Sequence, residues 1–387
     1  MRHFCAQGGM KRHYSRNKNL CILIFGLSFF FVNTSMNAQD EMHPDSLRLR
    51  AFIYPLGYYS PETRLGLGAA GAINLKFSFD PQTPASQIGF GFGYTQNDQY
   101  TVGLPFAFYS FRRKHSVTGE LSFNRFNYLY YGIGKGNEKG ENWTYDLHYD
   151  LFRINYLWQV KSHYFIGARW WYENDKGIQF RDSLVDQNNV SGMLGGVSSG
   201  PGLVFSYDNR DNIYFSQKGW YVELVAQDQS SWWGSDFSFN RYRFDVRHFH
   251  PMQKNLILAN QFFGDFTAGD VPFGQLAMLG SGRRGRGYYM GRYRDNHLLL
   301  YQGECRWLLG QKWGFTAHWM YALLADRLSD FDFRHDHAAV GFGMRYVFDT
   351  ESRSTIRLDM SLPLDRGVYI HEPDQALKFY FSVNEAF

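Results

Sequence analysis

The sequence predicts an all-β fold, a transmembrane antiparallel β-barrel of about sixteen strands, and three observations carry that prediction. Aromatic residues make up 19% of the 387 residues, while charged residues still make up 20%. No apolar run is long enough to cross a bilayer as a helix, which excludes a helical membrane protein. Much of the chain instead alternates apolar with polar or small residues at period two, as strands between lipid and an aqueous lumen do.

Three segments show this alternation most clearly. In "QIGFGFGYTQ" (87–96) bulky apolar residues alternate with glycines, and in "RYRFDVRHF" (241–249) they alternate with charged residues. The segment "STIRLDMSLPL" (354–364) repeats the pattern with Arg357 and Asp359 on its polar side. Period two with one charged face predicts a strand that has lipid on one side and a polar lumen on the other.

Taken in order, the alternating segments predict a closed barrel with an even number of strands. Candidate strands lie near 50–59, 64–79, 87–96, 99–110, 115–124, 145–158, 161–173, 196–208, 218–228, 236–250, 254–266, 296–308, 313–325, 337–349, 353–361 and 376–387. An even count places both ends of the barrel on the periplasmic side. The connection between the eleventh and twelfth strands is then the sixth extracellular loop.

The N-terminus predicts export. Residues 1–39 combine five basic residues and no acidic one with an apolar run too short to span a bilayer, followed by a small-residue zone near Ala38. We therefore expect a signal peptide at 1–39, with translation starting at Met1 or Met10. A short periplasmic lead-in at 40–49 and a barrel at 50–387 complete the domain organisation.

Removal of that leader changes the charge of the protein. The leader holds 5 of the 40 Lys and Arg residues and none of the 36 Asp and Glu residues, which leaves 35 against 36, a net charge of −1. A mature protein with this balance has no basic footprint for nucleic acid. Cys5 and Cys21 leave with the leader, so Cys305 has no partner for a disulfide.

The stretch "SGRRGRGYYMGRYRDN" (281–296) falls in the predicted sixth extracellular loop and combines five arginines with four glycines. Because a barrel of this size leaves an aqueous lumen, a loop held inside by guanidinium–carboxylate bonds would close it. We assign this lumenal role to Arg286. A solvated surface loop, or contact with lipopolysaccharide phosphate, is the reading favoured for the other four arginines, Arg283, Arg284, Arg292 and Arg294.

Around this stretch the sequence resembles the BamA/TamA-type outer-membrane assembly barrels, also called bacterial surface antigen barrels. "GRGYYMGRYRDNHLLLYQGECRW" (285–307) matches the family's Arg-Gly-Tyr/Phe element with Arg286, Gly287 and Tyr288. The resemblance implies that this sixth loop folds into the lumen and that its arginine meets carboxylates on the following strands. Glu304 matches the family's glutamate there.

Two more elements extend the resemblance. "GPGLVFSYDNRDNIYFSQKGWYVEL" (200–224) is similar to the family's Asp-x-Arg-Asp turn, carried by Asp208, Arg210, Asp211 and Gly219. The resemblance implies a periplasmic turn in which these charges brace the chain reversal. "YYGIG" (130–134) is a third, shorter match.

The C-terminal strand carries a signal of its own. "LKFYFSVNEAF" places Phe387 on the same side as Phe379 and Phe381 at period two, which resembles the recognition signal of proteins inserted into the outer membrane. Glu385 departs from that signal, because an apolar residue is usual at its position.

Two departures limit what the resemblance implies. Family members that insert or secrete proteins carry periplasmic polypeptide-transport-associated repeats, whereas here about ten residues separate the predicted cleavage zone from the first strand. The family's aspartate on strand thirteen is also missing, and His318 or Tyr321 stands in its place. We therefore expect Arg286 to rely on Glu304.

The resemblance implies an outer-membrane protein of a Gram-negative bacterium that contributes to protein insertion, translocation or outer-membrane assembly. Its implied partners are outer-membrane lipid and lipopolysaccharide, the outer-membrane assembly machinery and a separate periplasmic protein, with no cofactor and no nucleic acid. The alternative is a plugged pore for small solutes or lipids.

Catalysis and metal binding are weighed and set aside. "YTQ" (94–96) is similar to a fragment of outer-membrane phospholipase, but the sequence has no His-x-Ser-Asn-Gly partner for it. "FRHDHAAV" (333–340) holds two histidines and an aspartate, yet adjacent strand positions point to opposite faces. A polar extracellular loop is the favoured reading there. The sequence thus predicts neither an enzyme nor a metal site.

Overall fold

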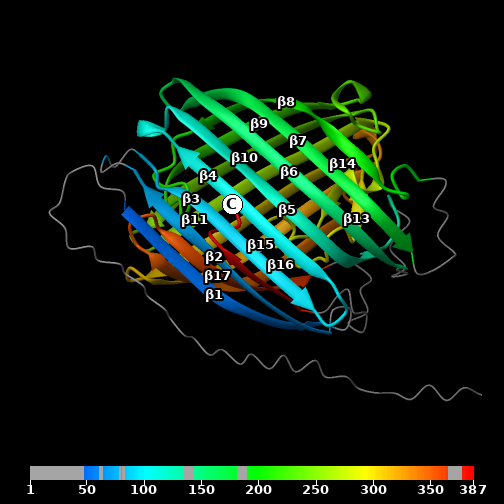
Figure 1. Ribbon diagram of the computed structural model, residues 1–387. Helices are drawn as coiled ribbons and strands as arrows, with labels where there is room; N and C mark the ends of the chain where they lie inside the picture. The colour runs from blue at the N-terminus through cyan, green and yellow to red at the C-terminus, as the bar shows by residue number, and fades with distance from the viewer. Residues whose placement is uncertain are drawn as a thin grey trace, which may run out of the picture. The chain divides into compact units, whose positions relative to one another are not determined.

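The computed structural model describes residues 48–60, 64–77, 80, 83–134, 143–180, 190–364 and 377–387. All of them belong to one compact unit, 32–387. The predicted signal peptide and the periplasmic lead-in up to residue 47 lie outside the described residues. Sixteen antiparallel strands form one sheet in chain order, and two short strands form a separate ribbon (Figure 1).

The sixteen-stranded sheet confirms the strand count read from the sequence. Its strands are β1 (Arg48–Ser60), β2 (Arg64–Lys76), β3 (Ser86–Thr95), β4 (Tyr100–Tyr109), β5 (His115–Tyr130), β6 (Trp143–Lys161), β7 (Tyr164–Phe180), β8 (Gly196–Asp208), β9 (Gly219–Gln229), β10 (Phe239–Gln253), β11 (Leu256–Gly269), β14 (His297–Leu309), β15 (Trp313–Ala325), β16 (Asp336–Asp349), β17 (Ser354–Pro363) and β18 (Lys378–Val383). The predicted strands 115–124 and 161–173 end six and seven residues too early, and the last strand ends at Val383 and not at Phe387.

Helical structure in the described part of the chain is limited to single 3-10 turns. They are η1 (Phe111–Arg113), η3 (Ser231–Trp233), η4 (Phe273–Gln275) and η5 (Leu328–Asp330). None of the helices described here has the length and hydropathy needed to cross a bilayer.

The alternation read from the sequence corresponds to two faces of the wall. On β17, Arg357 and Asp359 are fully buried on the inner face, whereas Met360 and Leu362 are 40% and 42% exposed on the outer face. An apolar outer face and a charged inner face are the arrangement that lipid outside and water inside select.

The two edge strands of the sheet, β1 and β18, meet through side chains. The rings of Tyr54 and Phe381 stand 4.9 Å apart, and Arg50 of β1 forms an ion pair with Asp349 at the end of β16. Among the described strands, β1 pairs through its backbone with β2 alone and β18 with β17 alone. The sheet therefore curls round on itself, and its seam lacks a backbone ladder in the part of the chain that the structure describes.

Residues 270–296, which we call the inner loop, connect β11 to β14. Within it β12 (Ala277–Leu279) pairs with β13 (Tyr293–Asp295), so that residues 280–292 form a lobe at the tip of a short ribbon. The lobe packs on the inner face of the wall, where Tyr288 joins a buried apolar cluster with residues of β11, β14, β15 and β16. The predicted inward-folded sixth loop is thus confirmed.

The connections divide into two sets, one at each end of the barrel. We call the end that holds residues 131–134, 190–195 and the inner loop the loop end, and the opposite end the turn end. Residues 209–218, between β8 and β9, are at the turn end, and we call them the cross-turn.

Candidate functional site

Glycines let the lobe of the inner loop approach the wall. Gly287 has a φ of +116°, and a Cβ built on it would lie 2.6 Å from the Cβ of Ala339 on β16. Both the left-handed backbone and the close approach require glycine at this position. Arg286, next to it, is therefore held against the inner face with little freedom.

Arg286 is the centre of the site and is 1% exposed. Its Nη2 lies 2.5 Å from Oε1 of Glu304 on β14, and its Nη1 lies 2.8 Å from Oδ2 of Asp359 on β17. Burial disfavours the charged guanidinium, but the two carboxylates outweigh burial and hold the pKa of Arg286 above its ordinary value. The arginine thus clamps the loop to two strands at once.

Three more arginines from the wall complete a buried ion network. Arg306 Nε lies 2.7 Å from Glu304 Oε2, and Arg345 Nη1 lies 2.6 Å from Asp359 Oδ1. Arg357 Nη2 donates to the carbonyl of Gly282 at 2.7 Å, which ties the inner loop to β17. Because such pairs are desolvated, removing one partner leaves the other charge uncompensated.

The wall makes room for this network by omitting side chains. A Cβ on Gly341 would lie 2.4 Å from Nε2 of His318, and one on Gly343 would lie 1.9 Å from Oδ1 of Asp359. His318 reaches across β16 at Gly341 to Ser361 on β17, with Nε2 and Oγ 2.6 Å apart. These two glycines belong to the site because they leave space for its side chains, although they have no functional group of their own.

Two tyrosine hydroxyls fix the backbone of the lobe. Tyr380 on β18 accepts a hydrogen bond from the amide of Gly287 at 2.9 Å and lies 3.2 Å from the carbonyl of Tyr288, to which it can donate. The hydroxyl of Tyr288 donates to the carbonyl of Ala338 at 2.7 Å. The lobe is thereby attached to β16 and β18 as well as to β14 and β17.

The structure brings together the residues predicted for the lumenal motif and adds one that sequence reasoning missed. Arg286, Gly287, Tyr288 and Glu304 all meet on the inner face, as described above. The expectation that Arg286 would rely on Glu304 is corrected by Asp359, which supplies a second carboxylate. The alternation in 354–364 placed Asp359 on the polar face of its strand but did not indicate its position along the barrel axis relative to Arg286.

The favoured surface reading of Arg292 and Arg294 is wrong. They are 6% and 2% exposed. Arg292 stacks on the rings of Tyr131 and Tyr293, each 4.5 Å from its guanidinium carbon. The amide of Gly134 donates to the carbonyl of Arg294 at 2.9 Å. The segment "YYGIG" thus binds the base of the inner loop. Arg292 packs on buried aromatic rings, so its position does not require lipopolysaccharide phosphate as a partner.

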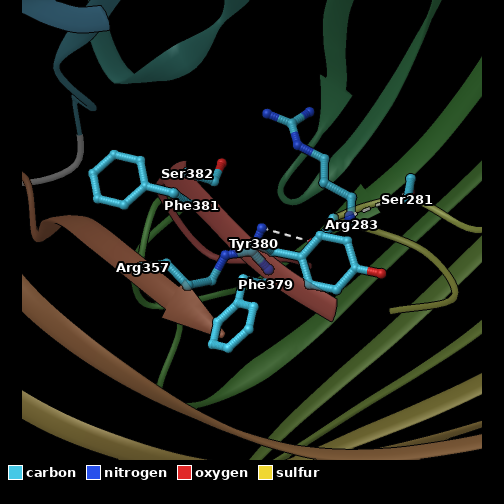
Figure 2. A pocket seen from close by; sticks show the side chains of 8 residues that line it. Ser281, Arg283, Arg357, Phe379, Tyr380, Phe381 and Ser382 are labelled. Atoms are coloured by element: carbon cyan, nitrogen blue, oxygen red, sulfur yellow. Dashed lines mark hydrogen bonds between the residues drawn. The ribbon is translucent and has the colours of Figure 1, made fainter. Parts of the chain in front are cut away.

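Arg284 and Arg283 also lie inside the barrel. Arg284 Nη2 is 3.4 Å from Oδ2 of Asp245 on β10, and its guanidinium carbon is 3.7 Å from the ring centre of Phe263. Arg283 lines a cavity of about 410 Å³ between the inner loop and β17–β18 (Figure 2). The cavity is lined by Ser281, Gly282, Arg283, Arg357, Phe379, Tyr380, Phe381 and Ser382. The surface reading is therefore corrected for Arg284, which pairs with Asp245 inside the barrel, whereas Arg283 keeps an exposed side chain.

The Asp-x-Arg-Asp element lies where the sequence placed it, at the start of the cross-turn. Asp208 binds Arg210 through Nε at 2.8 Å and Arg113, in the turn before β5, at 2.6 Å. Asp211 accepts from the amides of the cross-turn and pairs with Arg353 at 2.6 Å. Gly219, with a φ of +108°, takes up the reversal.

The cross-turn does more than reverse the chain. The side-chain amide of Asn212 donates to the carbonyl of Ser352 at 3.0 Å, and the hydroxyl of Tyr214 donates to the carbonyl of Ala85 at 2.7 Å. Four strands separate β9 from β16 on one side, and four separate β8 from β3 on the other. Since strands are about 4.8 Å apart, the cross-turn must pass over the mouth to reach both places.

The predicted position of Phe387 is wrong in its geometry. β18 ends at Val383, and Asn384 has a φ of +62°, which turns the following residues inward. Phe387 is 5% exposed and packs with Phe249 and Ala259 on the inner face. Glu385, the departure noted in the sequence, accepts from Nε of Arg345 at 2.9 Å. The role of Phe387 as an insertion signal stays a prediction.

Two smaller expectations also have an outcome. The segment 333–340 is split between a loop and β16, with Asp336 as the first strand residue. No group of three or more metal-ligating side chains gathers among the described residues. Tyr321, offered with His318 for the missing acid, alternates with buried Met320 and Ala322 and so faces away from the network.

Known proteins share this fold. The barrel of BamA from Haemophilus ducreyi lacking POTRA domains 1–3 is 14% identical, with a TM-score of 0.54 over 88% of this chain and 70% of that chain. CdiB from Acinetobacter baumannii is 8% identical, with a TM-score of 0.56 over 87% of this chain and 59% of that chain. CdiB from Escherichia coli is 13% identical, with a TM-score of 0.52 over 89% of this chain and 63% of that chain. No curated protein matches this chain in sequence.

The family follows from a match over most of the chain. The Omp85 superfamily domain matches residues 64–387, a range that holds β2 to β18, the cross-turn and the inner loop with its arginine clamp. The BamA and CdiB proteins that share this barrel belong to the outer membrane of Gram-negative bacteria, in agreement with the lipid-facing wall described above. This chain is an outer-membrane β-barrel of the Omp85 superfamily.

Proposed function

We propose that this barrel contributes to the insertion or translocation of proteins at the outer membrane, with a separate periplasmic protein as its partner. The observation that carries the proposal is the seam between β1 and β18. β1 spans 13 residues and β18 spans 6, and the described strands meet there through side chains and not through a backbone ladder. A wall with an unpaired edge can add a strand from another chain.

The inner loop supports the proposal because it is attached close to that seam. Tyr380 of β18 holds the lobe at Gly287, and Arg357 of β17 holds it at Gly282. A movement of β18 away from β1 would therefore change the same contacts that keep the loop inside the lumen. This arrangement suits a barrel in which opening of the wall and position of the loop are coupled.

A reversible lock of the seam tests the proposal. Tyr54→Cys and Phe381→Cys, in a Cys305→Ser background, would be joined by a short bifunctional thiol reagent, since the two rings are in contact. In liposomes, the unlocked barrel should accelerate the folding of a urea-denatured outer-membrane barrel, and the locked barrel should not. Each single cysteine variant treated with the same reagent is the control. Equal acceleration by the locked and unlocked forms would overturn the proposal.

The periplasmic partner needs its own test. The barrel extracted from its native membrane in mild detergent should bring with it a soluble periplasmic protein, and substitutions on exposed residues of the turn end should reduce recovery of that protein. Lys218, an exposed residue of the cross-turn, is a suitable position. Recovery of the barrel alone from gently solubilised membranes would remove the partner from the proposal.

The orientation in the membrane is tested with two further cysteine positions. Trp232, 91% exposed at the loop end, should react as Trp232→Cys with an impermeant thiol reagent on whole cells. Lys218→Cys, at the turn end, should react only after the outer membrane is permeabilised. The reverse result would show that the loop end faces the periplasm.

A plugged pore for small solutes is the second candidate function, and the cavity beside the inner loop favours it. If the protein is a pore, the locked seam should leave solute flux unchanged, because flux would pass through the lumen and not through the wall. Flux that persists with the seam locked, together with no effect on protein folding, would favour this candidate.

A further inference from the structure

The wall on the far side of the lumen leaves open space beside the inner loop. On β3, Phe92 and Tyr94 are 51% and 48% exposed on the outer face, so Gly91 faces inward. A Cβ built on Gly91 meets nothing within 4 Å, and one on Gly103 of β4 meets only the Oγ of Ser122 at 3.8 Å. The inner loop therefore fills one side of the lumen and leaves this side accessible to water.

Charged groups begin directly next to this open wall. Ser122 of β5 donates to Oε1 of Glu120 at 2.9 Å, and Oε2 of Glu120 lies 3.2 Å from Nη2 of Arg153 on β6. Arg169 of β7 pairs with Glu223 of β9 at 3.3 Å. The small-residue wall thus leads into a charged wall that runs from β5 to β10.

Positive charge exceeds negative charge on this charged wall and the neighbouring part of the inner loop. Six guanidinium groups face four carboxylates. The guanidinium groups are Arg153, Arg169, Arg243, Arg247, Arg283 and Arg284, and the carboxylates are Glu120, Glu223, Asp245 and Asp265. Six minus four leaves an excess of two positive charges around Arg283. Toward the loop end, Arg241 adds one positive group and Glu173 and Asp175 add two negative ones, so the excess over the whole wall is seven minus six, or one.

Arg283 carries this excess into the open space. Its guanidinium has no hydrogen-bond or ion-pair partner among the described residues, whereas Arg284 beside it pairs with Asp245. The side chain extends away from Arg357 and Tyr380 (Figure 2). It keeps exposed surface, and the charged groups that act on it are Glu120 of β5 and Arg247 of β10. The five N–H donors of its guanidinium are thus available to a ligand inside the lumen.

We propose that the lumen binds the phosphate group of a small solute at Arg283, in the open space between the inner loop and β3–β5. A guanidinium binds phosphate through two parallel hydrogen bonds, and excess positive charge in an enclosed cleft raises the local concentration of anions. Arg153 of β6, whose Nη2 pairs with Glu120, is a second guanidinium on the same wall. The inference is independent of the protein-insertion proposal, because it concerns the lumen and not the seam.

The local potential is tested first, with a cysteine as a probe. Gly103→Cys is introduced with Cys305→Ser, and its rates with an anionic and a cationic methanethiosulfonate reagent are each divided by the rate on a free thiol. We expect the anionic reagent to react at least about threefold faster at low ionic strength. Arg283→Gln should remove most of this preference, whereas Arg112→Gln, on an exposed turn, should keep it.

Phosphate binding is tested on the same protein. Millimolar inorganic phosphate should slow the reaction of the anionic reagent with Gly103→Cys, and should have no such effect when Arg283→Gln is also present. Gly91→Cys repeats the measurement if Gly103→Cys does not fold, as judged by the gel shift between unheated and boiled samples. A thiol that reacts with neither reagent, a preference for the cationic reagent, or equal protection by phosphate with and without Arg283 would each overturn the proposal.

Discussion

The inner faces of β3–β4 and of β14–β17 both line the lumen, but they differ in how closely other parts of the protein pack on them. On β3–β4 a Cβ on the inward Gly91 would meet open space, one on Gly103 would meet only the Oγ of Ser122, and Thr101 is exposed. On β14–β17 the inward residues Glu304 and Asp359 are fully buried beneath the inner loop. Both walls alternate at period two, so periodicity alone does not distinguish them.

This difference in packing shows that the inner loop is attached to β14–β17, where glycines leave room for its ion network. The four arginines of the ion network stand on the loop and on β14–β17, and the glycines that make room for them, Gly341 and Gly343, are on β16. On β3, Gly91 makes room for no protein atom, and a Cβ on Gly103 of β4 would meet only the Oγ of Ser122 at 3.8 Å. Glycine in one wall therefore admits a packed network, whereas glycine in the other leaves a water-filled space.

The largest expected effect is loss of the arginine clamp. Arg286→Ala should lower the free energy of unfolding by about 3–5 kcal/mol, since it leaves Glu304 and Asp359 buried with one partner fewer. The urea midpoint of the gel shift measures the loss. Glu304→Ala should act similarly, and the double variant should be no worse than the worse single variant.

The matched control for the clamp is Arg112, which pairs with Asp80 on an exposed turn. Arg112→Ala should leave the midpoint unchanged. In planar bilayers, Arg286→Ala and Glu304→Ala should each raise conductance as the lobe loosens. Fully additive effects of Arg286 and Glu304 would contradict the pairing.

The base of the inner loop should come next in magnitude. Arg294 packs its guanidinium against Tyr130 and Phe273 and donates to the carbonyl of Phe273 at 3.3 Å. Arg294→Ala should therefore destabilise the barrel by about 1–3 kcal/mol, in the range of a lost buried hydrogen-bonding group. Arg334→Ala, whose side chain is 87% exposed, is the control and should have no effect. Equal midpoints for the two variants would show that burial of Arg294 is unimportant.

A pair of glycine substitutions compares the two walls directly. Gly287→Ala should destabilise the barrel by about 1–3 kcal/mol, because it strains a φ of +116° and brings a methyl group 2.6 Å from Ala339. Gly91→Ala should change stability by less than about 0.5 kcal/mol, since its methyl group meets nothing. The urea midpoint is the measurement again. A larger loss at Gly91 than at Gly287 would mean that the space beside β3 is occupied.

The smallest effect concerns one hydroxyl at the seam. Tyr380→Phe removes the acceptor for the amide of Gly287 and should lower the free energy of unfolding by about 1 kcal/mol. Phe379→Leu, on the outer face of the same strand, keeps every hydrogen bond and the ring contact between Tyr54 and Phe381, so it serves as the control. If Tyr380→Phe matches this control, β18 does not hold the lobe.

Much of the wall could be predicted from the sequence because lipid outside and water inside impose period two on every strand. The predicted strand 313–325 coincides with β15 for this reason. The end of the chain could not be predicted in the same way. "FSVNEAF" continues the alternation, but Asn384 turns the chain inward, where Phe249 and Arg345 provide better contacts than lipid does.

Only those residues of the ion network that belong to the family motif were predicted from the sequence. Arg286 and Glu304 were found through their resemblance to a family pattern, whereas Asp359 was seen only as a polar-face residue. Its height depends on the register across β14–β17, in which Glu304 pairs with His318, His318 with Gly341 and Gly341 with Ser361. Alternation assigns a residue to a face of the sheet but does not set the register between strands. Asp359, two residues before Ser361, could therefore not be identified as a partner of Arg286.

The cross-turn ties the order of synthesis to closure of the barrel. Residues 209–218 are made about 140 positions before Ser352 and Arg353, their partners across the mouth. Asn212 and Asp211 therefore have no partner across the mouth until the hairpin of β16 and β17 has been made. Phe215, which is buried in the finished barrel, stays exposed until the late strands are in place. A chain that ends before that hairpin would leave the cross-turn open to an added protease, whereas the finished barrel would protect it. Protection of the cross-turn therefore reports that the late strands are in place.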